Sequence, residues 1–162
     1  MFMDWTPEEQ AQHRARWVNR LRNGGLNQAT GALVGFAHNP DGTPGSGYCC
    51  LGVACVVASE DPDLAEHLAV DYRSWEVVFN DGGYDEYLPD VLVRYYGLND
   101  DHGSMAVRNY DGLEDTSSLV EWNDNGLSFS AIADIIEAGF DEAHNPVPVP
   151  AKVIDAGYER VE

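Results

Sequence analysis

Two adjacent cysteines, Cys49 and Cys50, open the most apolar stretch of the sequence and are its candidate nucleophiles. At the first turn of a helix, the amide donors and the helix dipole favour a thiolate. Several thiol hydrolases place their nucleophile on such a buried helix and take a histidine from a following strand as the base. His67 and His102 are the candidate bases here. The plainer interpretation, which we favour, is that both cysteines are small buried apolar side chains, because free cysteine is among the most buried residue types.

The spacing of possible metal ligands gives little support to a metal site. Cys50 and Cys55 are five residues apart and face different ways on a helix, and the chain has no Cys-x-x-Cys or paired-histidine spacing. A calcium loop with Gly126 at its sixth position would need a glutamate where Ile132 stands. Residues 99–101 (Asn-Asp-Asp) fit either a weak surface ion site or an acidic turn. We therefore expect no metal and no cofactor.

A different chemistry, anion binding, is indicated by arginines and by a helix N-terminus. Arg14 falls on the apolar face of the first predicted helix, where a charge needs a carboxylate, a carbonyl or a ligand; internal pairing is the usual outcome. Ser128 caps the last predicted helix, and Asn123 or Asp124 can lock the turn before it. Because helix N-termini bind anions, we predict that a small anionic ligand or a partner's acidic group binds near Ser128, Arg14 and Arg22.

Capping and periodicity predict the elements that would position these residues. A helix over 7–23 starts after Thr6, which forms a Thr-x-x-Glu capping box with Glu9, and ends at Gly24-Gly25. Residues 48–58 are nearly all apolar and fit a buried strand or helix; we favour a short helix in which Gly52 permits close packing. Further helices are predicted at 62–70, 88–96, 117–122 and 129–143, and strands at 75–79 and 104–110. Residues 26–36 predict a strand or a bent hairpin arm.

These elements predict an α+β fold, a single compact domain over 1–144 with several short helices around a small antiparallel sheet. The segment 38–47 (HNPDGTPGSG) contains three turn pairs and predicts a loop. Residues 145–150 (NPVPVP) cannot continue a helix, so we expect 145–162 to be an extended or flexible C-terminal tail.

The net charge of −19 excludes some classes of partner. Residues 1–50 balance four arginines against four carboxylates, so the remaining 5 basic and 24 acidic residues all lie in 51–162. Such a surface repels nucleic acid and anionic lipid and attracts basic partners, although solubility alone also explains it. We therefore expect no nucleic-acid and no membrane partner. No signal peptide or membrane-length apolar run is present, and three cysteines make no disulfide framework, so a cytoplasmic location is predicted.

Aromatic side chains gather in the middle of the chain, where Trp75 and six tyrosines lie between residues 72 and 110. Tyrosine and tryptophan are favoured at interfaces and as stacking platforms. Core packing accounts for most of them, and we expect two or three to be exposed.

Four stretches together resemble a group of small accessory proteins carried by tailed bacteriophages. They are 17–28 (WVNRLRNGGLNQ), 48–55 (YCCLGVAC), 88–98 (LPDVLVRYYGL) and 122–137 (WNDNGLSFSAIADIIE). The resemblance extends to about Phe140 and leaves out the 38–47 loop and the tail. It implies expression in the cytoplasm of a bacterial host. It carries no established reaction, so no catalytic residue can be transferred from it.

Three functional hypotheses follow. The first, which we favour, is a non-catalytic phage accessory protein that binds and inhibits or sequesters a host protein or a small anionic molecule, with a possible anti-defence role. The second is a thiol-dependent hydrolase that uses Cys49 or Cys50. The third is an acidic mimic of nucleic acid. We rank it last because its carboxylates would need regular rows, whereas the acidic residues here are scattered among turns.

Overall fold

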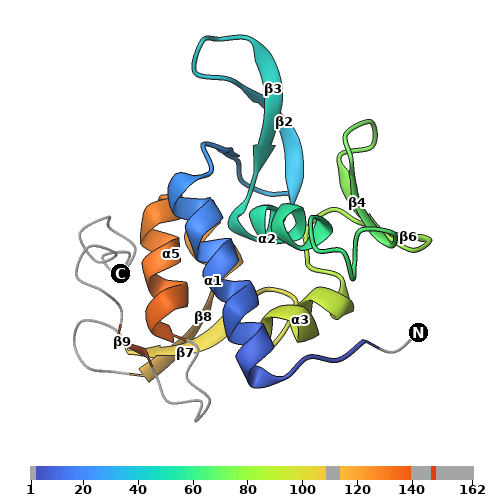
Figure 1. Ribbon diagram of the computed structural model, residues 1–162. Coiled ribbons are helices and arrows are strands. Elements are labelled where there is room, and N and C mark those ends of the chain that lie inside the picture. Colours follow the sequence, from blue (N-terminus) through green and yellow to red (C-terminus); the bar gives the residue numbers. More distant parts are fainter. Residues whose placement is uncertain (1–2, 109–113, 140–146, 149–162) are drawn as a thin grey trace.

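The computed structural model describes residues 3–108, 114–139 and 147–148 of the chain (Figure 1). Within these residues the helices are α1 (Pro7–Asn23), α2 (Cys50–Ser59), α3 (Asp90–Tyr96), α4 (Leu119–Asp124) and α5 (Phe129–Gly139). The strands are β1 (Asn27–Gln28), β2 (Val34–His38), β3 (Pro44–Tyr48), β4 (Leu68–Asp71), β5 (Glu76–Phe79), β6 (Gly82–Tyr84), β7 (Ser104–Arg108), β8 (Glu114–Ser118) and β9 (Val147–Pro148). The α+β class predicted from the sequence is confirmed.

The strands form three small sheets instead of the single sheet that the sequence suggests. Their orders are β1-β3-β2, β4-β5-β6 and β8-β7-β9, and antiparallel pairs dominate, with β1–β3 and β7–β9 parallel. In the first two sheets the strands follow one another closely in the chain, whereas in the third sheet β9 pairs with β7 from much further along the sequence. The strands are at most five residues long, so they leave the core to the helices.

The core is centred on α2, whose residues are buried except Val56 and Ser59. α1 lies beside α5 and packs across α2, and α3 and α4 close the remaining sides (Figure 1). The indole Nε1 of Trp17 donates to the carbonyl of Cys50 at 2.9 Å, which joins the middle of α1 to the start of α2. The short-helix prediction for 48–58 is therefore confirmed, one to two residues further along the chain.

Glycine at position 52 allows α2 to lie directly against the segment that precedes β2. A Cβ atom placed there would lie 1.7 Å from the carbonyl oxygen of Leu33, far inside van der Waals contact. The predicted role of Gly52 in close packing is thus confirmed, and the neighbour is backbone.

The local rules for α1 also hold. Thr6 Oγ1 accepts from the amide of Glu9 at 3.1 Å, and the Glu9 carboxylate accepts from the amide of Thr6 at 2.9 Å, which completes the capping box. The buried face consists of His13, Trp17, Val18 and Leu21.

The helix predicted at 62–70 is wrong. Residues after Asp61 form turns, and β4 then pairs antiparallel with β5. The Asp61 carboxylate accepts from the amide of Asp63 at 3.0 Å, a local bond that competes with helix formation. The acidic 61–67 segment has only Leu64 to bury, so no apolar face favours a helix there.

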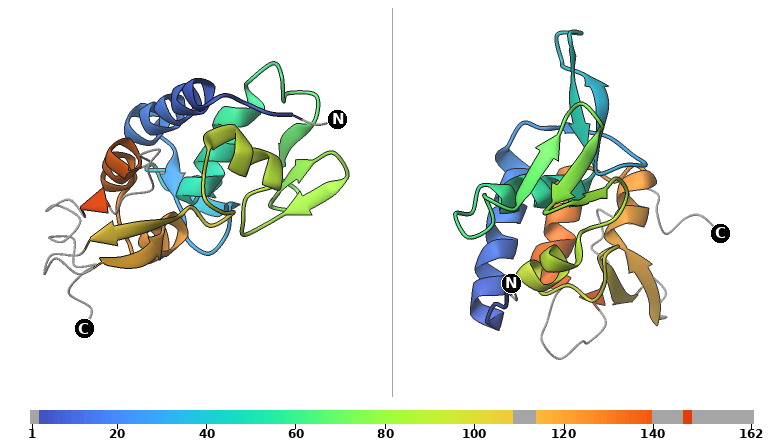
Figure 2. Two further views of the ribbon diagram at one scale, coloured as in Figure 1. Left: turned by 90° about the horizontal axis from the view of Figure 1, so that it is seen from below. Right: turned by 90° about the vertical axis from the view of Figure 1, so that its right-hand side faces the viewer.

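The loop predicted at 38–47 is also wrong over its second half, because Pro44–Tyr48 is strand β3. The β2–β3 hairpin projects from the body as an arm, clearest in Figure 1 and in the right-hand view of Figure 2. A Cβ at Gly47 would lie 2.9 Å from the Cβ atoms of both Ala29 and Ala37. Glycine, which reads as a loop residue in the sequence, is required here by close strand packing.

The 26–36 segment contains β1 and the start of β2 with bends between them, and the strand predicted at 104–110 is described to Arg108. Strand β5 and helices α3 and α4 lie within two residues of their predicted bounds, and α5 is described to Gly139. Tyr72 and Tyr87 are exposed, in agreement with the two or three exposed aromatics expected, while Tyr110 lies outside the described residues. The proposed domain boundary at 144/145 and most of the tail lie outside them as well. Among the helices described, none has the length and apolarity needed to cross a membrane.

Candidate functional site

The three cysteines are buried and protonated at neutral pH. Cys49 is the N-cap of α2, and its Sγ accepts from the amide of Gly52 at 3.4 Å. The Cys50 thiol donates to the carbonyl of Leu119 at 3.4 Å. Burial raises the pKa of Cys49 to about 11 and the pKa values of Cys50 and Cys55 well above the usual thiol range. Desolvation therefore outweighs the helix N-terminus, which otherwise favours a thiolate.

The two histidines proposed as bases are each bonded to a side chain other than a thiol. His67 Nδ1 is 3.1 Å from Asn80 Oδ1, beside the β4–β5 pair. His102 Nδ1 is 2.5 Å from Asp101 Oδ1, and its ring stacks on Tyr87 with centroids 3.9 Å apart. In the part of the chain that the structure describes, neither histidine hydrogen-bonds to a cysteine. The arrangement brings no base to a nucleophile.

We expect slow alkylation of all three cysteines in the native protein. Iodoacetamide reacts with the thiolate, and burial both raises the thiol pKa and restricts access. Mass spectrometry should find little label after treatment at pH 7.5 and complete label in urea. Fast labelling of Cys49 or Cys50 without denaturant would contradict this expectation and favour the hydrolase hypothesis.

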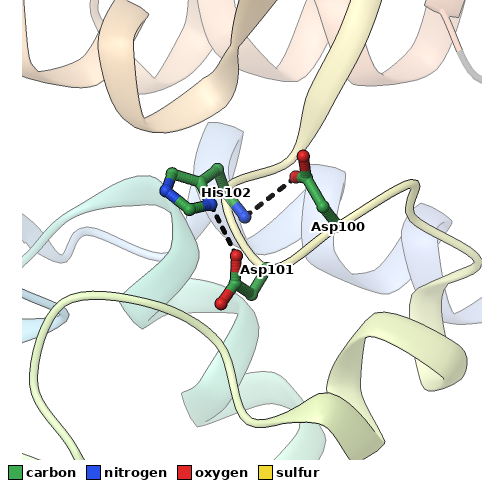
Figure 3. A group of neighbouring side chains, drawn as sticks. All are labelled: Asp100, Asp101 and His102. Atoms are coloured by element: carbon green, nitrogen blue, oxygen red, sulfur yellow. Dashed lines mark hydrogen bonds and ion pairs between the residues drawn. The ribbon is translucent and has the colours of Figure 1, made fainter.

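The acidic turn at 99–101 contains a compact group of possible metal ligands (Figure 3). Ligand atoms of Asp100, Asp101 and His102 all lie within 4.8 Å of one another. The Asp100 carboxylate accepts from the amides of His102 at 3.0 Å and Ser104 at 2.9 Å. Burial opposes ionisation of Asp100, but these bonds hold its pKa below the usual value. They also close the turn between α3 and β7, so the acidic-turn interpretation accounts for the arrangement of Asp100.

Asn123, predicted to bind a ligand, is a buried structural link. Its Oδ1 accepts from Gln28 Nε2 at 2.8 Å and from the amide of Cys50 at 3.2 Å, and its Nδ2 donates to the carbonyl of Ala29 at 2.8 Å. The neighbouring Asp124 accepts from the amide of Gly31 at 3.1 Å. Both residues therefore hold the 28–31 segment against α2 and α4.

Ser128 caps α5 as predicted, and its Oγ accepts from the amide of Ala131 at 3.2 Å. Arg14 and Arg22 lie elsewhere, in the wall of a cavity of about 430 Å³ between α1 and α5 whose lining does not include Ser128. Arg22 pairs with Asp134 at 2.6 Å and with Glu137 at 2.8 Å. The structure thus brings Arg14 and Arg22 together but separates them from Ser128.

Both guanidinium groups on this cavity are engaged by the protein. Arg14 Nη1 donates to the carbonyl of Tyr96 at 2.7 Å, the internal match that a charge on an apolar helix face requires. The pairing with Arg22 lowers the pKa of Glu137 and so favours its ionised form. An anionic ligand here would have to compete with those carboxylates.

A second cavity, of about 570 Å³, lies between α1 and the end of α2, and we call it the Arg16 groove. Its lining residues are Ala15, Arg16, Asn19, Arg20, Val57, Glu60, Asp61 and Pro62. Arg20 is bound to Glu60 by two hydrogen bonds, of 3.2 and 2.5 Å. The two arginines and two carboxylates balance, so this groove is electrically neutral on a strongly acidic protein.

A short network fixes Arg16 in the wall of the groove. The Tyr95 hydroxyl donates to Asp61 Oδ2 at 2.7 Å and accepts from Arg16 Nη2 at 2.6 Å. Burial, followed by the hydrogen bond to Asp61, raises the pKa of Tyr95, so the phenol stays protonated. Burial opposes ionisation of Asp61, but the bonds from the Asp63 amide and Tyr95, together with the charge of Arg16, lower its pKa. The network orients the guanidinium of Arg16 in the wall of the groove.

His13 also contacts Tyr95. Its ring stacks on the phenol with centroids 3.6 Å apart, and its Nδ1 lies 2.7 Å from the carbonyl of Tyr95. A carbonyl only accepts, so Nδ1 carries the proton in the neutral ring. Burial, the largest influence, lowers the pKa of His13 although that hydrogen bond and Asp61 act against it.

The lowered pKa of His13 predicts a pH-dependent stability. The unfolded histidine takes up a proton near pH 6.5, whereas the folded one takes it up only at lower pH. Stability is therefore complete above about pH 6.5 and falls as the pH drops through the interval between the two pKa values. Urea unfolding at pH 7.5 and 5.5 should show a larger loss for wild type than for His13→Gln. Equal losses of stability in the two proteins would contradict the assignment of this pH dependence to His13.

The groove was not predicted from the sequence, because Arg16 and Arg20 lie opposite the apolar face of the first helix, where arginine is usually solvated. A signal was present: the arginines are one helical turn apart, and Glu60-Asp61 ends the apolar stretch. Opposite charges at the end of one helix and on one face of another indicate a pairing. Nothing in the sequence indicates that Tyr95 contributes to the Arg16 groove.

Comparison with known proteins gives the family of the chain. No curated protein and no solved structure matches it. A family model, described as Domain of unknown function (DUF8296), matches residues 10–140, which is most of the chain and includes α2 to α5 and all but the first turn of α1. The chain therefore belongs to the DUF8296 family.

Proposed function

We propose that this protein is a non-catalytic binding protein that captures a small anionic molecule in the Arg16 groove. The proposal rests on the orientation and the exposure of the Arg16 side chain. Its guanidinium is oriented through Nη2 by Tyr95, while half of its side chain is exposed. Among the described residues, Nε and Nη1 of Arg16 have no acceptor. The N–H groups on these two nitrogens are therefore available to a ligand.

The chemistry of the groove supports an anion as the ligand. A planar guanidinium matches carboxylate and phosphate groups through paired hydrogen bonds. Asn19 Oδ1 accepts from Asn23, which leaves the Asn19 amide donors without an acceptor in the described residues. The volume of about 570 Å³ lies within the range of small-molecule sites, roughly 300–1,000 Å³. Because the charges of the groove balance, an anion is repelled less there than elsewhere on the acidic surface.

The resemblance to phage accessory proteins supports a bacterial cytoplasm as the place where the protein acts. In a bacterial cytoplasm, a non-catalytic protein with such a groove would act by sequestering its ligand, and an anti-defence role fits that action. The hydrolase alternative has the raised thiol pKa values against it. The nucleic-acid mimic has no row of carboxylates on the described elements to support it.

The test is to identify what the purified protein carries. Protein isolated from a bacterial lysate is denatured, and the released small molecules are measured by mass spectrometry for wild type, Arg16→Ala and Arg73→Ala. Arg73, exposed in the β4–β5 turn, is the matched control. We expect an anionic compound from wild type and Arg73→Ala, and about tenfold less from Arg16→Ala, since charge-assisted hydrogen bonds contribute roughly 1.5–3 kcal/mol.

Thermal melts accompany the measurement. The melting temperature of Arg16→Ala should stay close to that of wild type, because the Arg16 side chain is 50% exposed and its ion pair with Asp61 is long, at 3.5 Å. Equal amounts of compound from all three proteins, or none from wild type, would overturn the proposal.

A further inference from the structure

The two edges of the β2–β3 arm differ in how their backbone groups are satisfied. The amide of Asn39 donates to the carbonyl of Thr43 at 2.8 Å, so these residues form a hydrogen-bonded pair at the end of the arm. Bonded and non-bonded pairs alternate along an antiparallel ladder. With the observed register, the backbone groups of Val34, Phe36 and His38 therefore point away from β3, and those of their partners Pro44, Ser46 and Tyr48 point away from β2.

Every outward carbonyl of β3 has a donor. Asn39 Nδ2 reaches the carbonyl of Pro44 at 3.3 Å, and Asn27 Nδ2 reaches the carbonyl of Ser46 at 3.1 Å. The amide of Ala29 donates to the carbonyl of Tyr48 at 2.8 Å. Proline at position 44 also removes one outward amide. This edge is closed to further strands in the way that protected sheet edges are.

Among the described residues no strand pairs with the free edge of β2, although β5 lies close to β2. β2 is a terminal strand in the order β1-β3-β2, and no described residue hydrogen-bonds to the outward backbone groups of Phe36 or His38. The Phe36 side chain is 57% exposed and lies edge-to-face against His38, with centroids 5.0 Å apart. Open edges of this kind accept an added strand, with backbone bonds giving affinity and alternate side chains giving selectivity.

The base of the same arm is acidic. Gly31 and Ala32, which lead into β2, line a small cavity of about 60 Å³ together with Glu86, Tyr87 and Asp124. Asp124 uses one carboxylate oxygen for the amide of Gly31, and Tyr87 presents a ring that is 39% exposed. Carboxylates beside an aromatic ring suit an ammonium or guanidinium group. Ala32 is two residues from Val34, the first residue of β2, so the cavity lies at the base of the arm.

We propose that the β2 edge and this cavity bind an extended, basic segment of a partner protein by strand addition. The segment pairs with the outward backbone groups of Phe36 and His38, packs an apolar side chain on Phe36 and places an arginine or lysine between Glu86 and Asp124. The −19 net charge of the protein favours a basic partner over an acidic one and speeds its approach. This surface is independent of the Arg16 groove.

The experiment is a selection of random dodecapeptides displayed on a carrier and bound to the immobilised full-length protein. We expect enrichment of peptides in which apolar residues alternate with arginine or lysine. The most enriched peptide is then synthesised with a fluorescent label, and its Kd is measured by anisotropy. Absence of enrichment, or enrichment of acidic peptides, would overturn the proposal.

Matched variants locate the binding. His38→Pro removes one outward amide and leaves the β2–β3 ladder intact, as Pro44 does on the opposite strand; His38→Ala keeps the amide. We expect His38→Pro to weaken peptide binding about five- to tenfold relative to His38→Ala, the effect of one or two backbone hydrogen bonds. Equal affinities would exclude pairing at this edge.

The charge of the cavity is tested in the same assay. Glu86→Gln combined with Asp124→Asn should weaken binding about tenfold at low salt and by less at high salt, while Asp81→Asn, in the β5–β6 turn, should have little effect. Sedimentation measures whether the free protein dimerises. A dimer that His38→Pro dissociates and His38→Ala retains would assign the edge to a second copy of this chain and overturn the proposal.

Discussion

Replacing Gly52 with alanine should prevent folding or lower the free energy of unfolding by about 3 kcal/mol or more, the upper range for overpacked cores. The new Cβ would lie 1.7 Å from the carbonyl oxygen and 2.7 Å from the carbonyl carbon of Leu33. Backbone atoms cannot rotate away as a side chain can, and α2 is held in the core by α1 and α4. Either α2 or the segment before β2 would have to move.

Urea unfolding followed by circular dichroism measures this effect, and Gly35→Ala is the matched control. A Cβ at Gly35 would meet nothing within 4 Å, so that variant should unfold close to wild type. A stable Gly52→Ala protein with wild-type cooperativity would contradict the close contact between α2 and the segment leading into β2.

The second large effect is expected at Asn123. Asn123→Ala should cost about 3 kcal/mol or more, because it leaves the amide of Cys50 and the carbonyl of Ala29 without their buried partner, and each orphaned group costs roughly 1–3 kcal/mol. Asn123→Asp should also destabilise the protein. It keeps the shape but loses the donor to Ala29 and introduces a charge into a fully buried position.

The control for Asn123 is Asn125→Ala, at the C-terminal cap of the same short helix. Asn125 is exposed, and its side chain donates only to the carbonyl of Glu121, so we expect a small change in the free energy of unfolding. If Asn123→Ala unfolded like wild type, the residue would not act as a structural link, and its predicted role in ligand binding would regain support.

Both residues also matter for the proposed docking surface. Gly52 positions Leu33, and Asn123 holds Ala29, so both fix the base of the β2–β3 arm against the core. A weakened anchor would change the direction of the arm relative to Glu86 and Asp124. Conservative variants at these positions should therefore be checked for folding before any binding measurement is interpreted.

The sequence by itself determined the features that depend on neighbours within a few residues. The capping box at Thr6 and Glu9 placed the start of α1, and Ser128 placed the start of α5. The apolar run before Ser59 identified the central buried helix, and Gly97 in the left-handed conformation ends α3 where the sequence predicts. Caps and periodicity act within one helical turn, which is why they can be read without a structure.

Tertiary structure alone decided where the charged groups meet and which glycines belong to a strand. Arg22 pairs with Asp134 across 112 residues, and Arg16 meets Tyr95 across 79. Such pairs depend on how helices pack, and every acidic residue of the chain is a candidate partner until that packing is known. Gly47 belongs to β3 because Ala29 and Ala37 approach it, and composition alone cannot distinguish that close contact from the freedom of a loop.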